Sequence, residues 1–331
     1  MDLNNSQYDA AEMWCRESVS RASDFLFDTP LFETALQKKS EEINIPIEAL
    51  YSFFRNIHLI HVKRSTHNVR ESLNDILAEY SKKGRSILNI AKDINYPPYL
   101  LARLMVEQIL SASQQNKKAI TEAMRDPLGR LGDVNAIAPQ YLGSEKFKSV
   151  HNKPALQSKK STTRLSLEVM ESIDHDPMYG PSHDRERKVV GEEFEILLEQ
   201  TLRRMDVPFE TETDLRERGT SRTPDILLTC PVGIQVPKRN GQGLEWKVVC
   251  WIDSKAMFGD VNTHQTSVLP QAESYVHRFG PGLVLYWFGH APLERLDDGH
   301  GDVAISSWKV PEKMLLPTGD TIFKEKKKHA T

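Results

Sequence analysis

The stretch Lys247-Val248-Val249-Cys250-Trp251-Ile252-Asp253-Ser254-Lys255 decides the fold of the second half of the chain. Its apolar run is rich in β-branched and aromatic residues, which is typical of a buried strand. Charged residues follow directly, and in an extended chain residues two apart point to the same side. We therefore expect Asp253 and Lys255 to project together from the end of this strand.

A second apolar run, Ile226-Leu227-Leu228, is preceded by Thr223-Pro224-Asp225. Proline is compatible with the start of a strand, so the acid lies at the mouth of the predicted strand. If the two runs pair as a hairpin, Asp225 meets Asp253 and Lys255 at one edge. Without other acids nearby, Asp253 and Lys255 would be an ordinary exposed ion pair.

A helix is predicted from about 185 to 204, ahead of these strands, with a buried stripe made of Phe194, Leu197 and Leu198. Glu195 is a neighbour of Leu198 on the helix surface, so it lies at the margin of the stripe and can reach a cleft. Glu192 and Glu193 are expected in solvent, with Glu193 as the second choice for the site. Glu195 therefore adds a third acid.

Carboxylates and a lysine that converge at strand ends would hold Mg²⁺ through oxygen ligands. Such an ion could activate water and clamp a phosphate, while Lys255 orients the nucleophile or stabilises developing charge. Further on, Gln271 and Tyr275 are four apart on a predicted helix and share a face. Alone they would be ordinary helix-surface residues. A strand is predicted at 283–287, after Gly280-Pro281-Gly282.

The first 128 residues predict helices. Apolar residues recur at helical spacing over 86–94, Asn95-Tyr96-Pro97-Pro98 interrupts them, and the pattern resumes over 99–110. The same signature, Ile43-Asn44-Ile45-Pro46, occurs 51 residues earlier. Both places predict helix-turn-helix units, although a helical bundle that packs against a partner would show the same pattern.

Basic residues cluster locally although the formal net charge is −3. The segment 55–70 holds four Lys or Arg residues, three histidines and no acid, and 146–164 and the C-terminal tail are also Lys-rich. Such clusters can neutralise phosphates, while the alternative is a solvated surface. His58 and His61 are one helical turn apart without an evident third metal ligand, which favours a basic surface. The candidate nucleic-acid-binding residues are Lys63, Arg64, Arg70 and Arg103.

Composition limits the class of protein. Apolar residues make up 39% and charged residues 27%, as in soluble globular chains. No apolar run is long enough for a transmembrane helix, and the acidic N-terminus lacks a signal core, so we expect neither membrane insertion nor secretion. The three cysteines form no CxxC pair, which argues against a disulfide framework and indicates a reducing, intracellular setting.

Four short motifs, in their order along the chain, resemble those of the PD-(D/E)XK nuclease superfamily. They are Gly-x-x-x-Glu, Pro-Asp, Asp-x-Lys and Gln-x-x-x-Tyr. Closer still, the chain resembles the codanin-interacting nuclease family. This likeness rests on TPD at 223–225, WIDSKAxFGD at 251–260, RFGPG at 278–282, YxPxLxARL at 96–104 and MRDP at 124–127. It covers about residues 60 to 290.

The resemblance implies an α/β (α+β) fold, with a restriction-endonuclease-like core behind helical DNA-binding elements. It also implies a nuclear location and a codanin-type protein partner. Carried over by motif, the metal ligands for Mg²⁺ or Mn²⁺ would be Glu195, Asp225, Asp253 and the Ser254 backbone carbonyl. Lys255 would be the catalytic lysine, supported by Gln271 and Tyr275, with His264 as a second choice. Asp253 departs from the family's Glu and shortens the reach by one methylene.

These observations predict a helical domain at 1–128, a linker or insertion at 129–165, a nuclease-like domain at 166–316 and a basic tail at 317–331. The leading hypothesis is a Mg²⁺-dependent endodeoxyribonuclease, with branched DNA as one candidate substrate. The alternative is a nuclease-like scaffold that binds codanin and supports chromatin assembly with little turnover. A purely DNA-binding regulator would leave the acid and lysine set unexplained. The oligomeric state stays open, and a dimer is compatible with the sequence.

Overall fold

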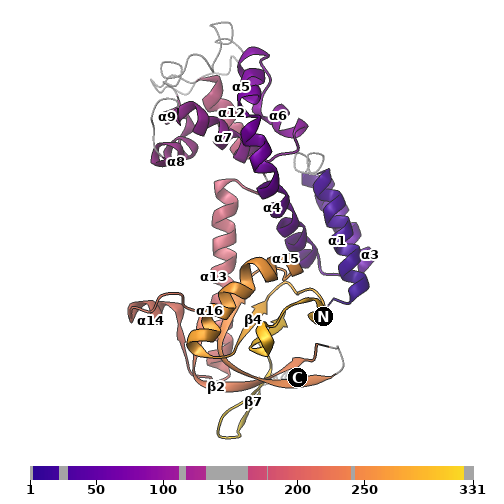
Figure 1. Cartoon of the computed structure of the whole chain (residues 1–331), viewed down its shortest axis with the longest axis vertical. Coiled ribbons are helices and arrows are strands. Elements are labelled where there is room, and N and C mark those ends of the chain that lie inside the picture. Colours follow the sequence, from indigo (N-terminus) through magenta and orange to yellow (C-terminus); the bar gives the residue numbers. More distant parts are fainter. Residues whose placement is uncertain are drawn as a thin grey trace, which may run out of the picture. The chain divides into compact units, whose positions relative to one another are not determined.

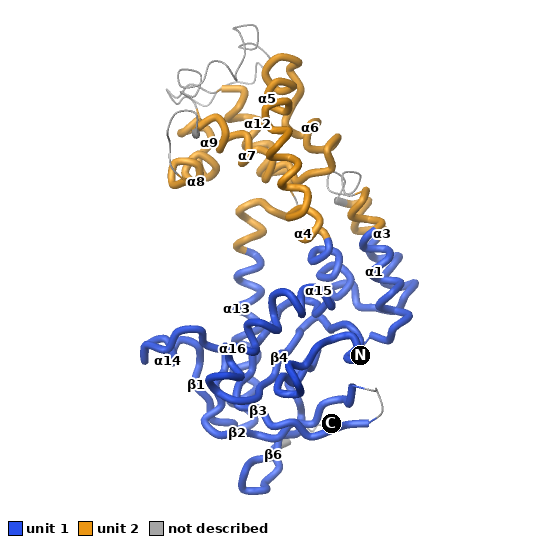
Figure 2. Tube along the Cα trace, viewed as in Figure 1, with its two compact units in different colours: residues 1–16, 36–57, 186–331 blue, residues 17–35, 58–185 orange. Residues whose placement is uncertain are grey.

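The computed structural model describes residues 3–21, 29–111, 117–131, 163–176, 178–239 and 243–323 (Figure 1). It is a mixed α and β structure, with helices in the N-terminal half and a sheet in the C-terminal half. The chain divides into two compact units, coloured separately in Figure 2. Unit 1 contains residues 1–16, 36–57 and 186–331, and unit 2 contains 17–35 and 58–185.

The unit boundaries differ from the domains that the sequence predicts. They fall inside four helices, which are α1 (Asn5–Ser20), α3 (Thr29–Ile43), α4 (Ile47–Glu71) and α13 (Pro181–Arg204). The first residues of the chain thus belong with the sheet rather than with a continuous helical domain. The expected boundaries near 128, 165 and 316 stay predictions, and the expected insertion and basic tail lie mostly outside the described residues.

Unit 2 is helical. Among its described residues, the remaining helices are α5 (Leu73–Lys82), α6 (Ile87–Asp93), α7 (Pro98–Ser111), α8 (Lys117–Arg125), α9 (Pro127–Arg130) and α12 (Arg164–Asp174). The helices predicted around residues 86–94 and 99–110 are α6 and α7, and both pack into one hydrophobic core. The apolar face differs at Ile94, which is exposed because it lies just beyond the end of α6.

The sequence repeat at Asn44 and Asn95 corresponds to a repeated helix end. Both asparagines have positive φ, 53° and 51°, a conformation that asparagine tolerates better than most residues. After α3, the Ile45 amide donates to Ser40 O and the Asn44 amide to Glu41 O. After α6, Tyr96 and Asn95 donate in the same way to Ala91 O and Lys92 O. Each end is therefore a Schellman motif, and the following proline starts the next helix.

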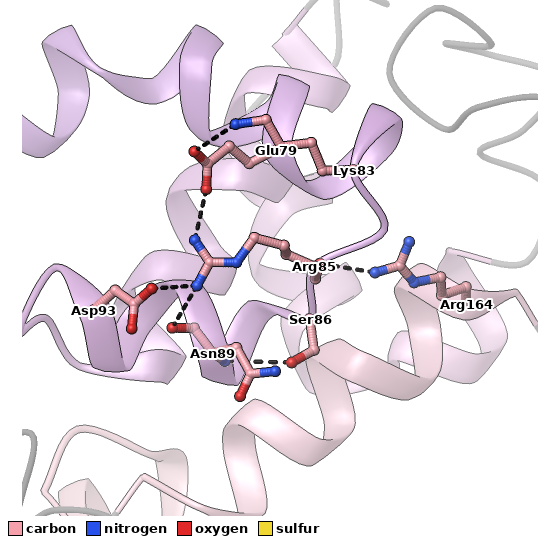
Figure 3. Close-up of polar contacts among 7 residues, drawn as sticks. All are labelled: Glu79, Lys83, Arg85, Ser86, Asn89, Asp93 and Arg164. Carbon is pink, nitrogen blue, oxygen red and sulfur yellow. Dashed lines mark hydrogen bonds and ion pairs between the residues drawn. The ribbon is translucent and has the colours of Figure 1, made fainter.

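A polar cluster joins α5, α6 and α12 within unit 2 (Figure 3). Arg85 pairs with Glu79 on α5 and with Asp93 at the end of α6. Arg164, at the start of α12, donates to the backbone carbonyls of Arg85 and Tyr80 at 2.8 and 3.1 Å. Tyr80 lies in the last turn of α5, where carbonyls lack intrahelical partners, so Arg164 satisfies its carbonyl and ties α12 to the turn between α5 and α6.

In the described part of unit 1, seven strands form a mixed sheet in the order β5-β4-β3-β2-β6-β7, with β1 also paired to β2. The strands are β1 (Phe209–Thr211), β2 (Ile226–Pro237), β3 (Leu244–Lys255), β4 (Gly282–Tyr286), β5 (Val303–Ser307), β6 (Lys313–Leu315) and β7 (Thr321–Phe323). The hairpin predicted from the sequence is β2–β3, with Ile226 opposite Ile252. Its register shifts between Leu227 and Val232, where Pro231 cannot donate a ladder hydrogen bond.

Helices pack against both faces of the sheet. On one face, Leu198 and Leu202 of α13 join a core with Ile252, Leu283 and Leu285. On the other face, Tyr275 of α16 (Leu269–Phe279) contacts Trp251 edge to face. Short elements complete the unit, namely α14 (Glu212–Glu217), α15 (Val261–Thr263), the π-helix His264–Val268 and two 3₁₀ turns at Leu293–Arg295 and Gly299–Gly301.

Two expected burial patterns were wrong. Leu197 is 40% exposed, because only Leu198 and Leu202 lie on the sheet side of α13, with Phe194 half-buried beside them. Val248 is 56% exposed, because the first half of β3 presents one side to solvent while Trp251 and Ile252 are fully buried. None of the helices in the described ranges combines the length and apolar character that a membrane span requires.

Candidate functional site

The ends of β2 and β3 bring the predicted acids together. Because Ile226 pairs with Ile252, Asp225 and Asp253 flank the same end of the hairpin. The Asp225 carboxylate accepts a hydrogen bond of 2.6 Å from the Ser254 amide. The proline before Asp225 is buried, and Thr223 is also buried, so the chain enters the strand in a fixed position.

Lys255 links this pair to α16. Its ammonium Nζ lies 2.6 Å from Asp253 Oδ2 and donates to Gln271 Oε1 at 3.2 Å. Gln271 Nε2 in turn donates to the Tyr275 hydroxyl at 2.6 Å. The expectations that Asp253 and Lys255 project together and that Gln271 and Tyr275 share a helix face are met by these contacts. The side chains form one chain of contacts from β3 to α16.

Burial and charge repulsion act on the acids of this site. Burial, and next the nearby Asp253 carboxylate, raise the pKa of Asp225 well above its ordinary value, although Lys255 opposes the shift. Burial lowers the pKa of Lys255, but the carboxylates of Asp253 and Asp225 outweigh it and the net pKa is raised. Lys255 therefore stays protonated at neutral pH and is the counter-charge of the buried acids.

Glu195 of α13 is half-buried, as expected for a residue at the edge of the buried side of the helix. Glu192 and Glu193 are exposed, also as expected. Burial raises the pKa of Glu195, and Glu212, Glu192 and Asp253 raise it further through their charges. Since charge interactions of this kind decay with distance, Glu195 belongs to the same electrostatic neighbourhood as Asp253 and Lys255.

The donor atoms suit a hard divalent cation. Asp253 Oδ2 is buried and has no hydrogen-bond donor of suitable geometry, so only the ion pair with Lys255 balances it. Mg²⁺ commonly binds one or two carboxylates and completes its shell with water and substrate phosphate. Asp225 and Asp253 fit that requirement. Across the described residues, however, no three His, Cys, Asp or Glu side chains are gathered as a metal site would gather them.

Sequence reasoning missed Glu212, the first residue of α14. Its amide donates to Asp225 O at 3.0 Å, and its carboxylate accepts from Thr223 Oγ1 at 3.1 Å and pairs with Arg216 at 2.7 Å. Glu212 also contributes to the raised pKa values of Glu195 and Tyr275. No motif spacing marks this acid, so only the fold could reveal it.

Two further contacts steady the strand that carries the site. The Trp287 indole N–H donates to Ser254 Oγ at 2.8 Å, and Phe194 of α13 packs on the Trp287 ring. Beyond Lys255, the Phe258 amide donates to Ser52 Oγ, and Asn56 donates to Asp260 and to Phe258 O. Residues of α4 thus hold the loop that follows the site, which explains why 36–57 belong to unit 1.

Two histidines that the sequence singled out, His58 and His264, are buried. His264 bonds Tyr286 and the Asp297 carbonyl at 2.8 and 2.6 Å, and burial lowers its pKa, so the neutral ring serves the core. The expected basic surface at His58 was wrong. His58 is fully buried in unit 2, bonds the Tyr179 hydroxyl, and has its pKa lowered to about 4 by burial and then by His61. It is uncharged at neutral pH.

The candidate nucleic-acid-binding residues lie in unit 2, away from the site along the chain. Lys63, Arg64 and Arg103 are exposed. Arg70 is exposed as well but pairs with Glu107 at 3.1 Å, which partly neutralises it. Exposure is compatible with binding to phosphates and does not distinguish it from a solvated surface.

Comparison with known proteins identifies relatives over most of the chain. Residues 161–306 match the family described as "Protein of unknown function TPD sequence-motif", which includes the Asp225, Asp253 and Lys255 region. Proteins named CDAN1-interacting nuclease 1 are 28% identical in cattle and in human, over 90% of this chain and 91% of each relative. The mouse protein is 29% identical over 82% of this chain and 86% of its own length.

The chain is thus similar over most of its length to proteins named CDAN1-interacting nuclease 1. The resemblance to the codanin-interacting nuclease family is thereby confirmed, while the PD-(D/E)XK resemblance stays a prediction. The names of these relatives state both a nuclease and an interaction with CDAN1. No solved structure matches the chain. The roles of Glu195, Asp225, Asp253, Lys255, Gln271 and Tyr275 stay predictions that the geometry above makes specific.

Proposed function

We propose that the chain is a metal-dependent nuclease that hydrolyses phosphodiester bonds in DNA, on a restriction-endonuclease-like PD-(D/E)XK core. The observation that carries this proposal is the Lys255 ammonium, placed between Asp253 at 2.6 Å and Gln271 at 3.2 Å, with Asp225 directly before the neighbouring strand β2. Structural ion pairs seldom place a buried acid, Asp253, beside a second, half-buried acid, Asp225, because the repulsion between the two carboxylates costs stability.

In the proposed reaction, the oxygen of water bonds to phosphorus, the ester P–O bond breaks, and the leaving oxygen takes up a proton. Lys255 stabilises the negative charge that develops on the phosphate, and Gln271 and Tyr275 hold the ammonium in place. Asp225, Asp253, the Ser254 carbonyl and Glu195 would hold Mg²⁺ or Mn²⁺. Such an ion lowers the pKa of bound water and neutralises phosphate charge. Glu193 is the second choice for a supporting role, whereas the ring nitrogens of His264, the other second choice from the sequence, already bond Tyr286 and the Asp297 carbonyl in the core.

The partner named by the homologues supports a second candidate, a nuclease-like scaffold that binds a codanin-type protein with little turnover. Two observations favour it. The described residues contain no ready-made metal site of three ligands, and the positive charge of Lys255 already offsets the negative charge of Asp253. The nuclease proposal includes a nuclear location. It also includes binding of DNA through four exposed basic residues, which are Lys63, Arg64, Arg70 and Arg103. The preference for branched DNA also belongs to it.

The deciding experiment is cleavage of linear, flapped and four-way DNA by the purified chain, with Mg²⁺, with Mn²⁺ and with chelator. Metal-dependent cleavage should fall by on the order of 100-fold or more in Lys255→Ala and in Asp225→Asn, the scale of one positioned electrostatic group. Lys247→Ala, on the same strand but paired with Glu245, is the matched control. Equal trace activity in all four proteins would favour the scaffold.

A further inference from the structure

The loop that leads into Asp225 carries an arginine with unusual features. Arg222 has a φ of 52°, in the left-handed region that non-glycine residues other than Asn and Asp rarely adopt. The side chain is exposed, whereas Thr223 and Pro224 directly after it are buried. Arg222 therefore sits at the point where the chain passes from solvent into the site.

Two contacts fix the loop in this conformation. The guanidinium of Arg278, at the end of α16, donates to the backbone carbonyls of Ser221 and Arg222. At the other end, α14 ends at Glu217, Gly219 follows with φ 78°, and the Thr220 amide donates to Leu215 O at 3.0 Å. The surrounding structure thus maintains a backbone conformation that costs roughly 1–2 kcal/mol for a residue with a side chain. Strain of this kind concentrates at functional positions.

The positive charge of Arg222 is not offset by an ion pair within the described residues, unlike the charges of the nearby Arg216 and Arg218. Arg216 pairs with Glu212 and Arg218 pairs with Glu210, each at 2.7 Å. Arg222 makes no ion pair with any residue that the structure describes. A polyanion that approaches the acids Glu195, Glu212, Asp225 and Asp253 meets like charge, so a cation beside them would offset the repulsion.

We infer that Arg222 binds a backbone phosphate of the nucleic acid a few nucleotides at most from the phosphate that is cleaved, an inference that rests on the proposed nuclease function. Arg222 and Asp225 are three positions apart in the sequence, so their Cα atoms are at most about 11 Å apart. Phosphates recur every ~3.4 Å of axis along one strand of duplex DNA. The contacted phosphate therefore lies within about three nucleotides of the cleaved bond. The ligand is the phosphate backbone, so the contact is independent of base sequence.

The test measures binding of a labelled DNA duplex by fluorescence anisotropy over a range of salt. All proteins carry Asp225→Asn, so that cleavage does not interfere. Removing one phosphate contact should weaken binding about 5–10-fold at low salt and lower the slope of log K against log salt by about 1. Arg222→Ala and Arg222→Gly should both show this loss, and Arg222→Lys should retain most of the affinity.

Two controls separate charge from loop conformation. Glycine adopts positive φ freely, so Arg222→Gly keeps the backbone but removes the charge. Lys238→Ala removes an equally exposed charge at the far end of β2 and should bind like the parent. Melting temperatures check that each variant is folded. Parental affinity and slope in Arg222→Gly, or an equal loss in Lys238→Ala, would overturn the inference, as would no binding to DNA at all.

Cleavage by the protein with Asp225 intact is measured separately. Salt-dependent binding that needs Arg222, without metal-dependent cleavage, would support the phosphate contact and contradict the nuclease function. Cleavage that is unaffected by Arg222→Gly at DNA concentrations below KM would contradict the contact and leave the nuclease function standing.

Discussion

Replacing Lys255 by methionine should destabilise the protein sharply in the absence of metal. Methionine keeps much of the length and packing of the lysine stem but removes its charge. The Asp253 side chain is 1% exposed and that of Lys255 17%, so solvent screens the pair little. The variant leaves a buried carboxylate without its counter-charge and beside Asp225.

The magnitude follows from the geometry. Opposite unit charges 2.6 Å apart attract by about 6 kcal/mol at an effective dielectric constant near 20. The variant also avoids the cost of burying the ammonium, and protonation of the orphaned acid limits the loss further. Breaking a buried pair from one side typically costs about 3–5 kcal/mol. For a domain of this size that is a drop of roughly 6–20 °C in the melting temperature.

Thermal unfolding by circular dichroism in chelator at pH 7.5 is the assay. Lys247→Met is the matched control, because Lys247 lies on the same strand and pairs with Glu245 near the surface, where such pairs contribute at most about 1 kcal/mol. Equal melting temperatures for Lys255→Met and Lys247→Met would refute the argument that Lys255 is the counter-charge of Asp253.

Three other results are expected. Mg²⁺ or Mn²⁺ should raise the melting temperature, by the equivalent of about 2.7 kcal/mol at a hundredfold excess over Kd. The variants Asp225→Asn and Asp253→Asn should lose most of that gain. Equal gains in the wild type and both variants would contradict the metal site. The raised pKa of Asp225 means that its ionisation destabilises the native state as pH rises from the unfolded value near ~4 through the folded value. In chelator, Asp225→Asn should therefore melt above the wild type at pH 7.5 and the gap should close towards pH 4, whereas a gap that is constant with pH would exclude this cause. Gly282→Ala should lower the free energy of unfolding in urea by about 3 kcal/mol, because its Cβ would lie 2.0 Å from the buried Trp251 ring. A variant as stable as the wild type would show that the ring can move.

Local rules predicted several parts of the site. The alternation of a strand places Asp253 and Lys255 on one side, and the helical repeat places Gln271 beside Tyr275. The proline before Asp225 marks the start of β2. Each of these relations lies within a few residues of chain, where backbone geometry alone decides which side chains are neighbours.

Other contacts depend on how distant segments fold together. Glu212 reaches the site because its amide donates to Asp225 O, and Trp287, directly after β4 and 33 residues later in the chain, donates to Ser254. Leu197 is as apolar as Leu198, yet only Leu198 lies toward the sheet. No local pattern carries this information, because the packing of one element against another selects the face that is buried.

The division of the chain illustrates the same limit. Sequence pattern separates a helical half from a half with strands, and this contrast is present in the structure. It does not reveal that Ser52 and Asn56 of α4 bind the loop after Lys255, about two hundred residues away. Helical periodicity determines that α4 forms. Hydrogen bonds to Phe258 and Asp260, available only in the folded chain, decide which unit its first turns join.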